Sequence, residues 1–418
     1  MKSVDLNYIP EGWKKTKISK KLFFQEGPGV RKWQFTEEGI KLLNVGNINN
    51  SEINLDATDK HLSVEEAKGK YSHFLVDEGD LLIACSGIVV DNFHNKIAFA
   101  KAEHLPLCLN TSTMRFKALN DSVDLNYFKY FLQTVHFTSQ LQKLITGSAQ
   151  LNFGPSHIKK IDFLCPPLKT QQRIAAILDD AAALRDKTAQ LLTEYDLLAQ
   201  SIFLEMFGDV VSNPKKWKTQ TIEKLVIKSK GSIKRGPFGG ALKKEIFVDQ
   251  GYLVYEQYHA LNNDFDFARY YINEKDFQRL KGFEVKSGDI IISCSGVYLG
   301  KLAIIPENSK KGIINQALLK VTLDEERMRK DFFVFHFTQE NFRNRYFGAN
   351  RGAGIPNFPP MASFKKFPFI SPPLTLQNQF AEKIGLIEQQ KALAKQELQE
   401  SEDLFNCLLQ NAFKGELE

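Results

Sequence analysis

The sequence lacks the features of a membrane-spanning or secreted protein. No run of about 18 apolar residues, the length needed to cross a bilayer, occurs anywhere. The first residues, MKSVDLNYIPEGW, lack the apolar core of a signal peptide. Only five cysteines occur (85, 108, 165, 294 and 407), with no Cys-x-x-Cys pair or Cys/His cluster. We therefore expect a soluble cytoplasmic protein with reduced, buried thiols and no metal site.

Recognisable catalytic motifs are also absent. The chain has no G-x-x-x-x-G-K-[ST] phosphate loop and no H-E-x-x-H zinc motif. NFPP at 357–360 reverses the order of the amino-methyltransferase motif N-P-P-[FY], and no glycine-rich strand–loop–helix accompanies it. Glu284-Val285-Lys286 matches the end of a nuclease motif but lacks the preceding Pro-Asp. We expect no catalytic residues in this chain.

The charge is unevenly distributed. The 418 residues suit two to four domains and carry a net charge of +6, but residues 170–209 and 375–418 each carry a net −4. The remainder therefore carries +14, and residues 215–245 alone hold ten Lys/Arg against two Glu. Basic folded domains joined to acidic segments favour binding of a polyanion. For any single cluster, solvated lysines remain the alternative.

The chain repeats itself with an offset of about 206 residues. GDLLIACSG (79–87) returns as GDIIISCSG (288–296), 209 positions later. PEGW (10–13) matches PKKW (214–217), and Gly27-Pro28 matches Gly236-Pro237. Such an ordered series indicates a tandem duplication.

Each copy predicts a mixed α+β domain followed by a long helix. Buried strands are expected at the repeated nonapeptides, and helices with aromatic core faces at 123–145 and 329–347. Each proline-flanked, glycine-poor stretch that follows is about 37 residues long, or about 55 Å as a helix. We expect the two helices to pair with each other as an antiparallel coiled coil. The apolar stripes assigned to this role comprise Ile174, Leu178, Leu191, Tyr195, Ile202, Phe380, Ile387, Leu398 and Phe405.

The predicted division has four segments. Residues 1–165 and 210–371 form the two similar domains, and residues 166–209 and 372–418 form the central and C-terminal spacer helices.

Two equivalent glycine-containing segments are candidate DNA-binding turns. EGPGVRKW (26–33) and IKRGPFGGALKK (233–244) combine Gly-Pro with basic and aromatic residues. Glycine lets the backbone approach a phosphate, and Arg can donate two hydrogen bonds to guanine. The loops at 145–153 and 350–358 form a second pair. The alternative is that these are solvated turns, or loops that only position the next strand. The candidate residues are Arg31, Lys32, Trp33, Ser148, Gln150, Lys234, Arg235, Lys243, Lys244 and Arg351.

The full chain resembles the specificity (S) subunit of type I restriction–modification systems, the HsdS family. The resemblance rests on the domain–helix–domain–helix order, EGW near the start, two PPL…Q helix starts (166–172, 372–377), GPFGGALKK and the terminal NAFKGEL (411–417).

That resemblance implies target recognition domains that each read half of a bipartite double-stranded DNA site. The helices would set the gap and hold two methyltransferase (M) subunits, which bind S-adenosylmethionine and methylate adenine at N6. Restriction/translocase (R) subunits, with ATP and Mg²⁺, would join to cut DNA. This chain itself would bind no cofactor and would be no enzyme. The alternatives are a specificity subunit for a fused nuclease–methylase, a two-armed protein-interaction scaffold, or a nuclease with an unrecognised site.

Overall fold

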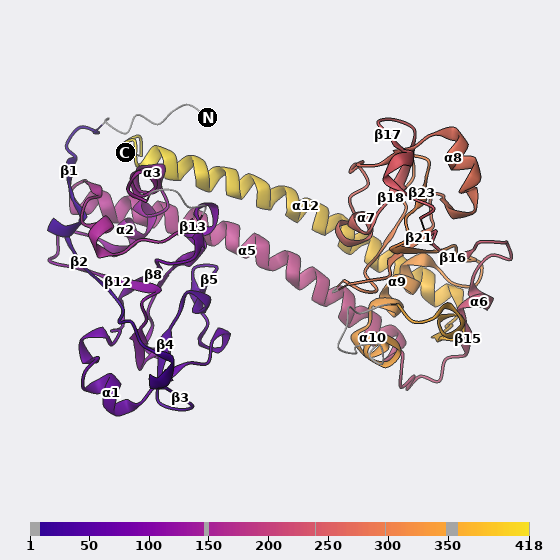
Figure 1. The fold of residues 1–418 in the computed structure, drawn as a ribbon, viewed down its shortest axis with the longest axis horizontal. Coiled ribbons are helices and arrows are strands. Elements are labelled where there is room, and N and C mark those ends of the chain that lie inside the picture. The colour runs from indigo at the N-terminus through magenta and orange to yellow at the C-terminus, as the bar shows by residue number, and fades with distance from the viewer. Residues whose placement is uncertain (1–8, 146–149, 239, 297, 348–357, 418) are drawn as a thin grey trace. The chain divides into compact units, whose positions relative to one another are not determined.

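The computed structural model describes residues 9–145, 150–238, 240–296, 298–347 and 358–417. The chain forms two compact units, one of residues 1–189 with 396–418 and one of residues 190–395. Each unit therefore combines one mixed α/β domain with a share of both long helices (Figure 1). The four-segment division expected from the sequence follows chain order and stays a prediction.

Unit 1 contains two four-stranded sheets, in the orders β10-β8-β12-β2 and β11-β4-β7-β3. The first is antiparallel throughout, whereas β11 and β4 run parallel. The strands are β1 (Lys14–Lys17), β2 (Leu22–Glu26), β3 (Phe35–Thr36), β4 (Ile40–Leu43), β5 (Ile48–Asn49), β6 (Glu52–Ile53), β7 (His61–Leu62), β8 (Leu81–Ala84), β9 (Ile88–Val89), β10 (Ile97–Phe99), β11 (Leu107–Leu109), β12 (Thr113–Ala118), β13 (Gln150–Leu151) and β14 (Asp162–Cys165). The helices are α1 (Val64–Lys68), α2 (Leu125–Phe131), α3 (Val135–Leu144) and α4 (Pro155–Ile158).

Unit 2 repeats this plan with sheets β16-β24-β21-β22 and β17-β19-β18-β23-β20. Its strands are β15 (Thr219–Thr221), β16 (Ile233–Arg235), β17 (Phe247–Val248), β18 (Tyr252–Tyr255), β19 (Tyr271–Ile272), β20 (Glu284–Val285), β21 (Ile290–Ser293), β22 (Leu302–Ile304), β23 (Gly312–Ile314), β24 (Leu318–Val321) and β25 (Pro368–Ile370). Its helices are α6 (Ile222–Leu225), α7 (Gln257–Asn262), α8 (Glu274–Arg279), α9 (Lys330–Thr338), α10 (Glu340–Phe347) and α11 (Met361–Phe364).

The repeated nonapeptides form equivalent buried strands, as expected. In unit 1 Leu81 of β8 pairs with Phe116 of β12, and in unit 2 Ile290 of β21 pairs with Val321 of β24. These pairs keep the sequence offsets of 209 and 205, so the duplication extends to the strand register.

Each predicted aromatic helix is in fact two helices. The stretch at 123–145 breaks before α3, where the Thr134 hydroxyl accepts a hydrogen bond from Phe137 N. A side chain that caps an orphan amide begins a new helix, because it satisfies a donor that the first turn leaves free. The stretch at 329–347 is likewise divided into α9 and α10 at Gln339.

The two long helices, α5 (Leu168–Phe207) and α12 (Leu374–Ala412), run antiparallel where they meet. In unit 2, Asp196 of α5 pairs with Lys391 of α12 at 2.7 Å. Farther along α5, Phe203 packs edge-on against Phe380, with ring centroids 5.5 Å apart. Residue numbers rise along one helix as they fall along the other, so the predicted antiparallel pairing is confirmed. Among the described helices, none combines the length and apolar character that crossing a membrane requires.

Candidate nucleic-acid interface

In each unit the Gly-Pro turn comes directly after an edge strand of the antiparallel four-stranded sheet. β2 ends at Glu26 before Gly27, and β16 ends at Arg235 before Gly236. A Cβ added to Gly27 would lie 2.5 Å from Asn110 N, and one added to Gly236 would lie 1.8 Å from Asn315 O. These glycines are therefore required by the approach of the chain's own backbone. From the sequence we expect these glycines to let a phosphate approach. On the side where a Cβ would lie, that expectation is wrong, because the backbone of Asn110 or Asn315 already fills the space.

Glu26 and Arg235 occupy the same place in the two units. Glu26 pairs in register with Met114 of β12, and Arg235 pairs with Leu319 of β24. The partners differ by 205 residues and the strand-end residues by 209, matching the offsets of the surrounding repeat. The same backbone position thus carries a carboxylate in one unit and a guanidinium in the other.

Both side chains lie beside the cysteine of the repeated Cys-Ser-Gly turn. Burial raises the pKa of the Cys85 thiol to about 12, and the nearby Glu26 carboxylate adds to this rise. Burial also raises the pKa of Cys294 to about 12, while the nearby Arg235 cation opposes it. The thiols themselves are therefore protonated at neutral pH and act as small apolar groups.

Glu26 is a half-buried carboxylate with little compensation from the protein. Its Oε1 accepts one long hydrogen bond, 3.4 Å, from the Thr111 hydroxyl. Burial raises its pKa, and that hydrogen bond opposes the shift. A Cβ on Gly154 would lie 2.8 Å from Glu26 Oε2, so the backbone at Gly154 passes against this carboxylate.

Arg235 is also half-buried and incompletely paired. Its Nε is buried and has no hydrogen-bond partner among the described residues. Its guanidinium lies 5.1 Å from the ring centroid of Phe238, whose side chain is 64% exposed. A carboxylate would accept hydrogen bonds from the guanidinium and so occupy its donors. An aromatic ring instead holds the guanidinium in place and leaves N–H donors unoccupied.

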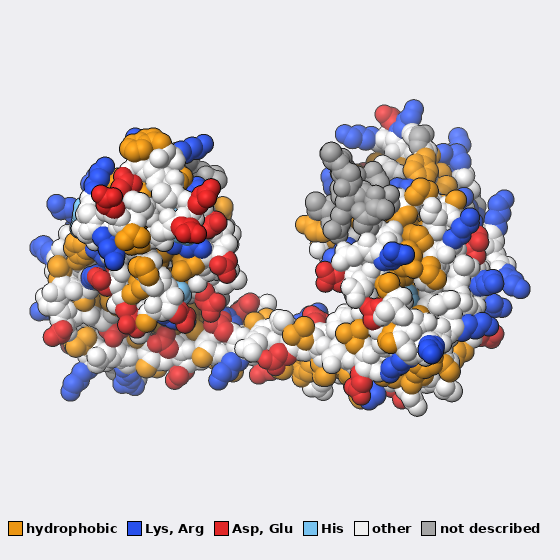
Figure 2. Space-filling model, turned by 90° about the horizontal axis from the view of Figure 1, so that it is seen from below, with side chains coloured by type: hydrophobic (Ala, Val, Ile, Leu, Met, Phe, Trp, Pro, Cys, Tyr) orange, Lys and Arg blue, Asp and Glu red, His pale blue; other side chains and the backbone are white. Residues whose placement is uncertain are grey.

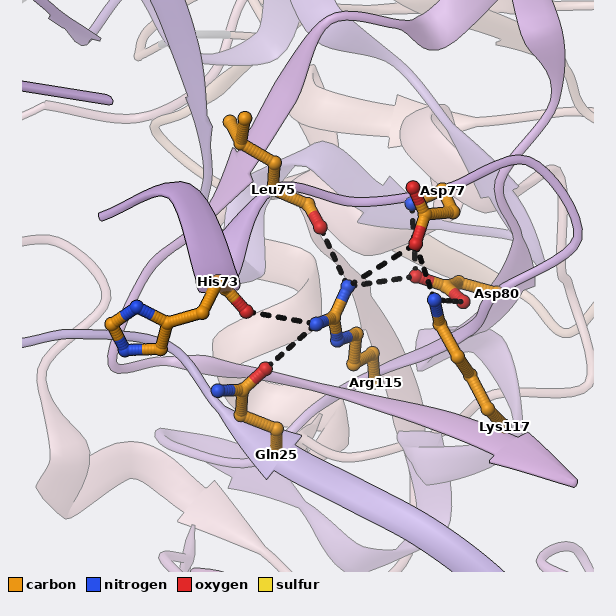
Figure 3. Close-up of polar contacts among 7 residues, drawn as sticks. All are labelled: Gln25, His73, Leu75, Asp77, Asp80, Arg115 and Lys117. Carbon is orange, nitrogen blue, oxygen red and sulfur yellow. Dashed lines mark hydrogen bonds and ion pairs between the residues drawn. The ribbon is translucent and has the colours of Figure 1, made fainter. Parts of the chain in front are cut away.

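A polar network fixes the strand end that carries Glu26 (Figure 3). Buried Arg115 of β12 donates to Gln25 Oε1 at 2.8 Å and to the carbonyl oxygens of Leu75 and His73 at 2.6 and 2.8 Å. It also pairs with the buried Asp80 at 3.3 Å. Because Gln25 precedes Glu26, this network holds the end of β2 against β12.

Unit 2 keeps a reduced form of this network. Lys320 stands at the position of Arg115, donates to the Glu284 carbonyl at 2.6 Å and lies 3.8 Å from Asp289. Burial lowers the pKa of Lys320, while the carboxylates of Asp289 and Glu284 oppose that shift. The network is therefore part of the scaffold of both units.

The second pair of loops is tied to the Cys-Ser-Gly turns. Asn152 Oδ1 accepts hydrogen bonds from Ser86 Oγ at 2.9 Å and Gly87 N at 2.8 Å. Phe153 N donates to Cys85 O, and in unit 2 Phe358 N donates to Cys294 O, both at 2.9 Å. The end of each loop thus lies next to the Cys-Ser-Gly turn, and a DNA-binding surface shared with the Gly-Pro turn stays a prediction.

The other predicted residues of the first turn are exposed. Arg31, Lys32 and Trp33 lie on a 3-10 turn, and Trp33 is 80% exposed. The turn is anchored by the buried Gln34, which donates 3.0 Å hydrogen bonds to Glu66 and Tyr71. These three side chains are therefore free to meet a ligand, and their DNA contact stays a prediction.

In the second turn the predicted residues are divided between faces. Because side chains alternate along a strand, Lys234 points to the opposite face of β16 from Arg235, and its ammonium lies 4.9 Å from the Phe283 ring centroid. Lys243 and Lys244 are exposed. Ser148 and Arg351 lie outside the described residues, as does the side chain of Gln150, which begins β13.

The charge of unit 2 is visible on its surface. Lys and Arg side chains line the right-hand margin of the lobe that holds unit 2 in Figure 2. This distribution agrees with the basic stretch 215–245. Among the described residues, no three His, Cys, Asp or Glu side chains are placed to hold a metal ion.

The apolar helix residues assigned to partner binding lie mostly within the chain's own units. Five are buried in the two largest cores, namely Ile174, Leu178 and Phe405 in unit 1 and Phe380 and Ile387 in unit 2. Tyr195 and Ile202 pack against the unit 2 core, and Leu191 and Leu398 are half-buried. Contact with an outside protein stays a prediction. The exposed leucines of the helices are Leu184, Leu197, Leu198, Leu204, Leu386, Leu393 and Leu404.

Residues 10–197 match the family of the type I restriction modification DNA specificity domain. The similarity expected from the motifs is thus found over the first α/β domain and most of α5. The second unit repeats the same topology, register and turn geometry as the specificity domain.

Relatives and solved structures agree with this assignment. The chain is 24% identical over 174 residues to the type I restriction enzyme MjaVIII specificity subunit of Methanocaldococcus jannaschii, covering 42% of this chain and 40% of that relative. The S subunit of a type I restriction–modification system from M. genitalium has the same fold, with a TM-score of 0.52, 16% identity and 97% coverage of both chains. A chain from a structure of type I R-M complex assembly and conformational transition gives a TM-score of 0.57 at 14% identity, covering 98% of this chain and 100% of that one. The identities are low, so these two structures establish the fold.

Sequence reasoning missed Glu26 in the first specificity domain. The signal was available, because Glu26 precedes Gly27-Pro28 as Arg235 precedes Gly236-Pro237. Glu26 was not among the predicted residues, because the candidates in the turns were chosen mainly for positive charge and Glu26 is acidic where Arg235 is basic.

Proposed function

We propose that this chain is the DNA sequence-specificity subunit of a type I restriction–modification complex. Each unit reads one half of a bipartite double-stranded DNA target, and α5 and α12 set the gap. The observation that carries the proposal is the family match of residues 10–197 together with the same Gly-Pro and Cys-Ser-Gly turns in the second unit. Differences between the two sets of turns allow different half-sites to be read from one scaffold.

The proposed complex supplies the chemistry from other chains. Two methyltransferase (M) subunits dock on the helices, where the exposed leucines offer apolar contacts. S-adenosylmethionine binds to those subunits, and ATP and Mg²⁺ to restriction/translocase (R) subunits. This chain then acts in the cytoplasm as a non-catalytic recognition subunit without a cofactor of its own.

A reconstitution experiment tests this function. The chain is combined with M subunits encoded beside it, and the complex is incubated with S-adenosylmethionine and a DNA library of randomised sequence. Sequencing of the modified sites is expected to reveal one bipartite motif with adenine N6 methylation. The chain alone is expected to shift DNA in a gel and to leave a plasmid intact in Mg²⁺. Cleavage by the chain alone would favour a nuclease, and absence of DNA binding in every combination would favour a protein scaffold.

The spacer role has its own test. Inserting one heptad into α5 between Leu191 and Leu198 keeps the apolar seam and lengthens the helix by about 10.5 Å. The gap between half-sites should then grow by about three base pairs, because DNA rises about 3.4 Å per pair. Methylation of a library with gaps of varied length measures this change. An unchanged gap at an undiminished rate would assign the spacing to another element.

A further inference from the structure

At the position before each Gly-Pro turn, the two units carry opposite charges within a matched backbone frame. Glu26 and Arg235 share strand register, the neighbouring cysteine turn and the following glycine, yet carry opposite charges. The surrounding scaffold keeps its chemistry, since a cation meets a buried aspartate in both units, Arg115 with Asp80 and the half-buried Lys320 with Asp289. A packing role alone gives no reason to exchange a carboxylate for a guanidinium beside an identical turn.

We infer that Glu26 and Arg235 are the base-reading residues at equivalent points of the two half-sites. Arg235 donates two hydrogen bonds to the major-groove edge of guanine, and Glu26 accepts one from the exocyclic amino group of cytosine or adenine. This inference rests on the proposed function.

The donors and acceptors of the two side chains match these bases. Guanine presents two acceptors in the major groove, N7 and O6, which suit the fork of a guanidinium. Cytosine N4 and adenine N6 are the amino donors exposed there, and a carboxylate can only accept. Thymine offers an acceptor and a methyl group, so Glu26 discriminates against it and against guanine.

The surroundings leave both groups available. The Nε of Arg235 is buried, so the two terminal nitrogens of the guanidinium are the donors that can reach a base; among the described residues the guanidinium rests on the exposed Phe238 ring. Among the described residues, Glu26 accepts one hydrogen bond, of 3.4 Å, from the exposed Thr111. At the same time, β2 pairs with β12 and β16 pairs with β24, so the backbone positions of Glu26 and Arg235 are fixed. A side chain that discriminates between bases needs such a fixed position.

The test uses the complex of this chain with its M subunits and the randomised methylation library. Arg235→Gln and Arg235→Lys should each cost about 5- to 150-fold in discrimination at one guanine of the second half-site. In the wild type, Glu26 should restrict one position of the first half-site to cytosine or adenine. Glu26→Gln should weaken the discrimination against thymine or guanine at that position by a similar factor. Because glutamine pairs well with adenine, that variant should favour adenine there. In each variant the other half-site should be unchanged.

The intact half-site serves as the folding control within each variant. Misfolding of a unit would weaken every position of its half-site, whereas loss of one base contact changes one position. Lys244→Gln is the matched surface control and should lower methylation of all sequences without changing the motif. The inference would be overturned if Arg235→Gln, Arg235→Lys and Glu26→Gln all recognised the same DNA motif as the wild type. It would also be overturned if the wild-type complex selected guanine or thymine at the position read by Glu26. A wild-type complex without a bipartite motif would instead refute the proposed function.

Discussion

Phe413 stacks on Tyr127, with ring centroids 5.0 Å apart. Tyr127 belongs to α2, whereas Phe413 follows the last turn of α12, 286 residues later in the chain (Figure 1). Unit 2 has the same contact, because Phe207 at the end of α5 meets Phe332 of α9 edge-on at 4.7 Å. Each core is thus closed by the end of the helix that begins in the other unit.

Phe413→Ala should destabilise unit 1 selectively. Truncating a buried phenylalanine costs about 3–5 kcal/mol, since it removes apolar contacts and leaves a cavity. Hydrogen exchange followed by mass spectrometry should show lost protection in peptides from residues 9–145 and unchanged protection in α9. Leu404→Ala, in α12 and 47% exposed, is the control and should change stability by less than about 0.5 kcal/mol. Equal effects of the two changes would contradict this assignment.

A fragment of residues 1–209 should form a dimer. It lacks Phe405, Leu409 and Phe413, which belong to the unit 1 core, but it keeps Phe207, the counterpart of Phe413. If two copies of α5 pair antiparallel, Phe207 of each fragment fills the core position that Phe413 occupies in the full chain. Light scattering measures the mass. Phe207→Ala should shift the fragment toward monomer, and a wild-type fragment that stays monomeric with M subunits present would disprove the pairing.

Lys243→Ala with Lys244→Ala should weaken DNA binding without changing sequence preference. If both lysines contact phosphates, the slope of log K against log salt should fall in magnitude by about 1.8, because each contact releases about 0.9 counterion. Binding titrations at several salt concentrations measure the slope. Lys383→Ala with Lys395→Ala, two exposed lysines on acidic α12, is the matched control. An unchanged slope in the first pair would remove those lysines from the DNA surface.

Unit 2 should lose stability in acid through His336. Complete burial lowers the pKa of this histidine to about 3. Its Nε2 accepts a hydrogen bond from Ile370 N, and its Nδ1 has no partner among the described residues. The unfolded chain takes up a proton below about pH 6.5 while the folded unit does not, so stability falls by roughly 1.4 kcal/mol per pH unit from there toward pH 3.

His336→Phe isolates that contribution, because Phe131 stands at the equivalent position of unit 1. The substitution should remove this part of the pH dependence between pH 6.5 and 4 in denaturant unfolding of unit 2, although loss of the Ile370 hydrogen bond lowers stability at neutral pH. A pH slope identical to that of wild type would exclude His336 as its source.

The sequence predicted the fold well because the duplication tests each element twice. GDLLIACSG and GDIIISCSG indicated a buried strand, and the glycine-poor stretches after 168 and 374 indicated the two helices. It could not show that Ile174 and Phe405 cover the chain's own domains, because an apolar stripe does not say which surface it meets. It also gave the wrong reason for Gly27, since the approach of Asn110 is a tertiary contact.

The closure of unit 1 by residues 396–418 imposes an order on synthesis. When the ribosome has made the first 189 residues, the aromatic surface around Tyr127 still lacks its last layer. Roughly 200 more residues must be added, which takes about 10–40 s at 5–20 residues per second. Unit 2 waits far less, because α5 precedes its sheets and α12 begins directly after β25. The domain made first is therefore completed last, and during that interval the apolar surface that residues 396–418 will cover stays open to solvent, a condition that favours aggregation in general.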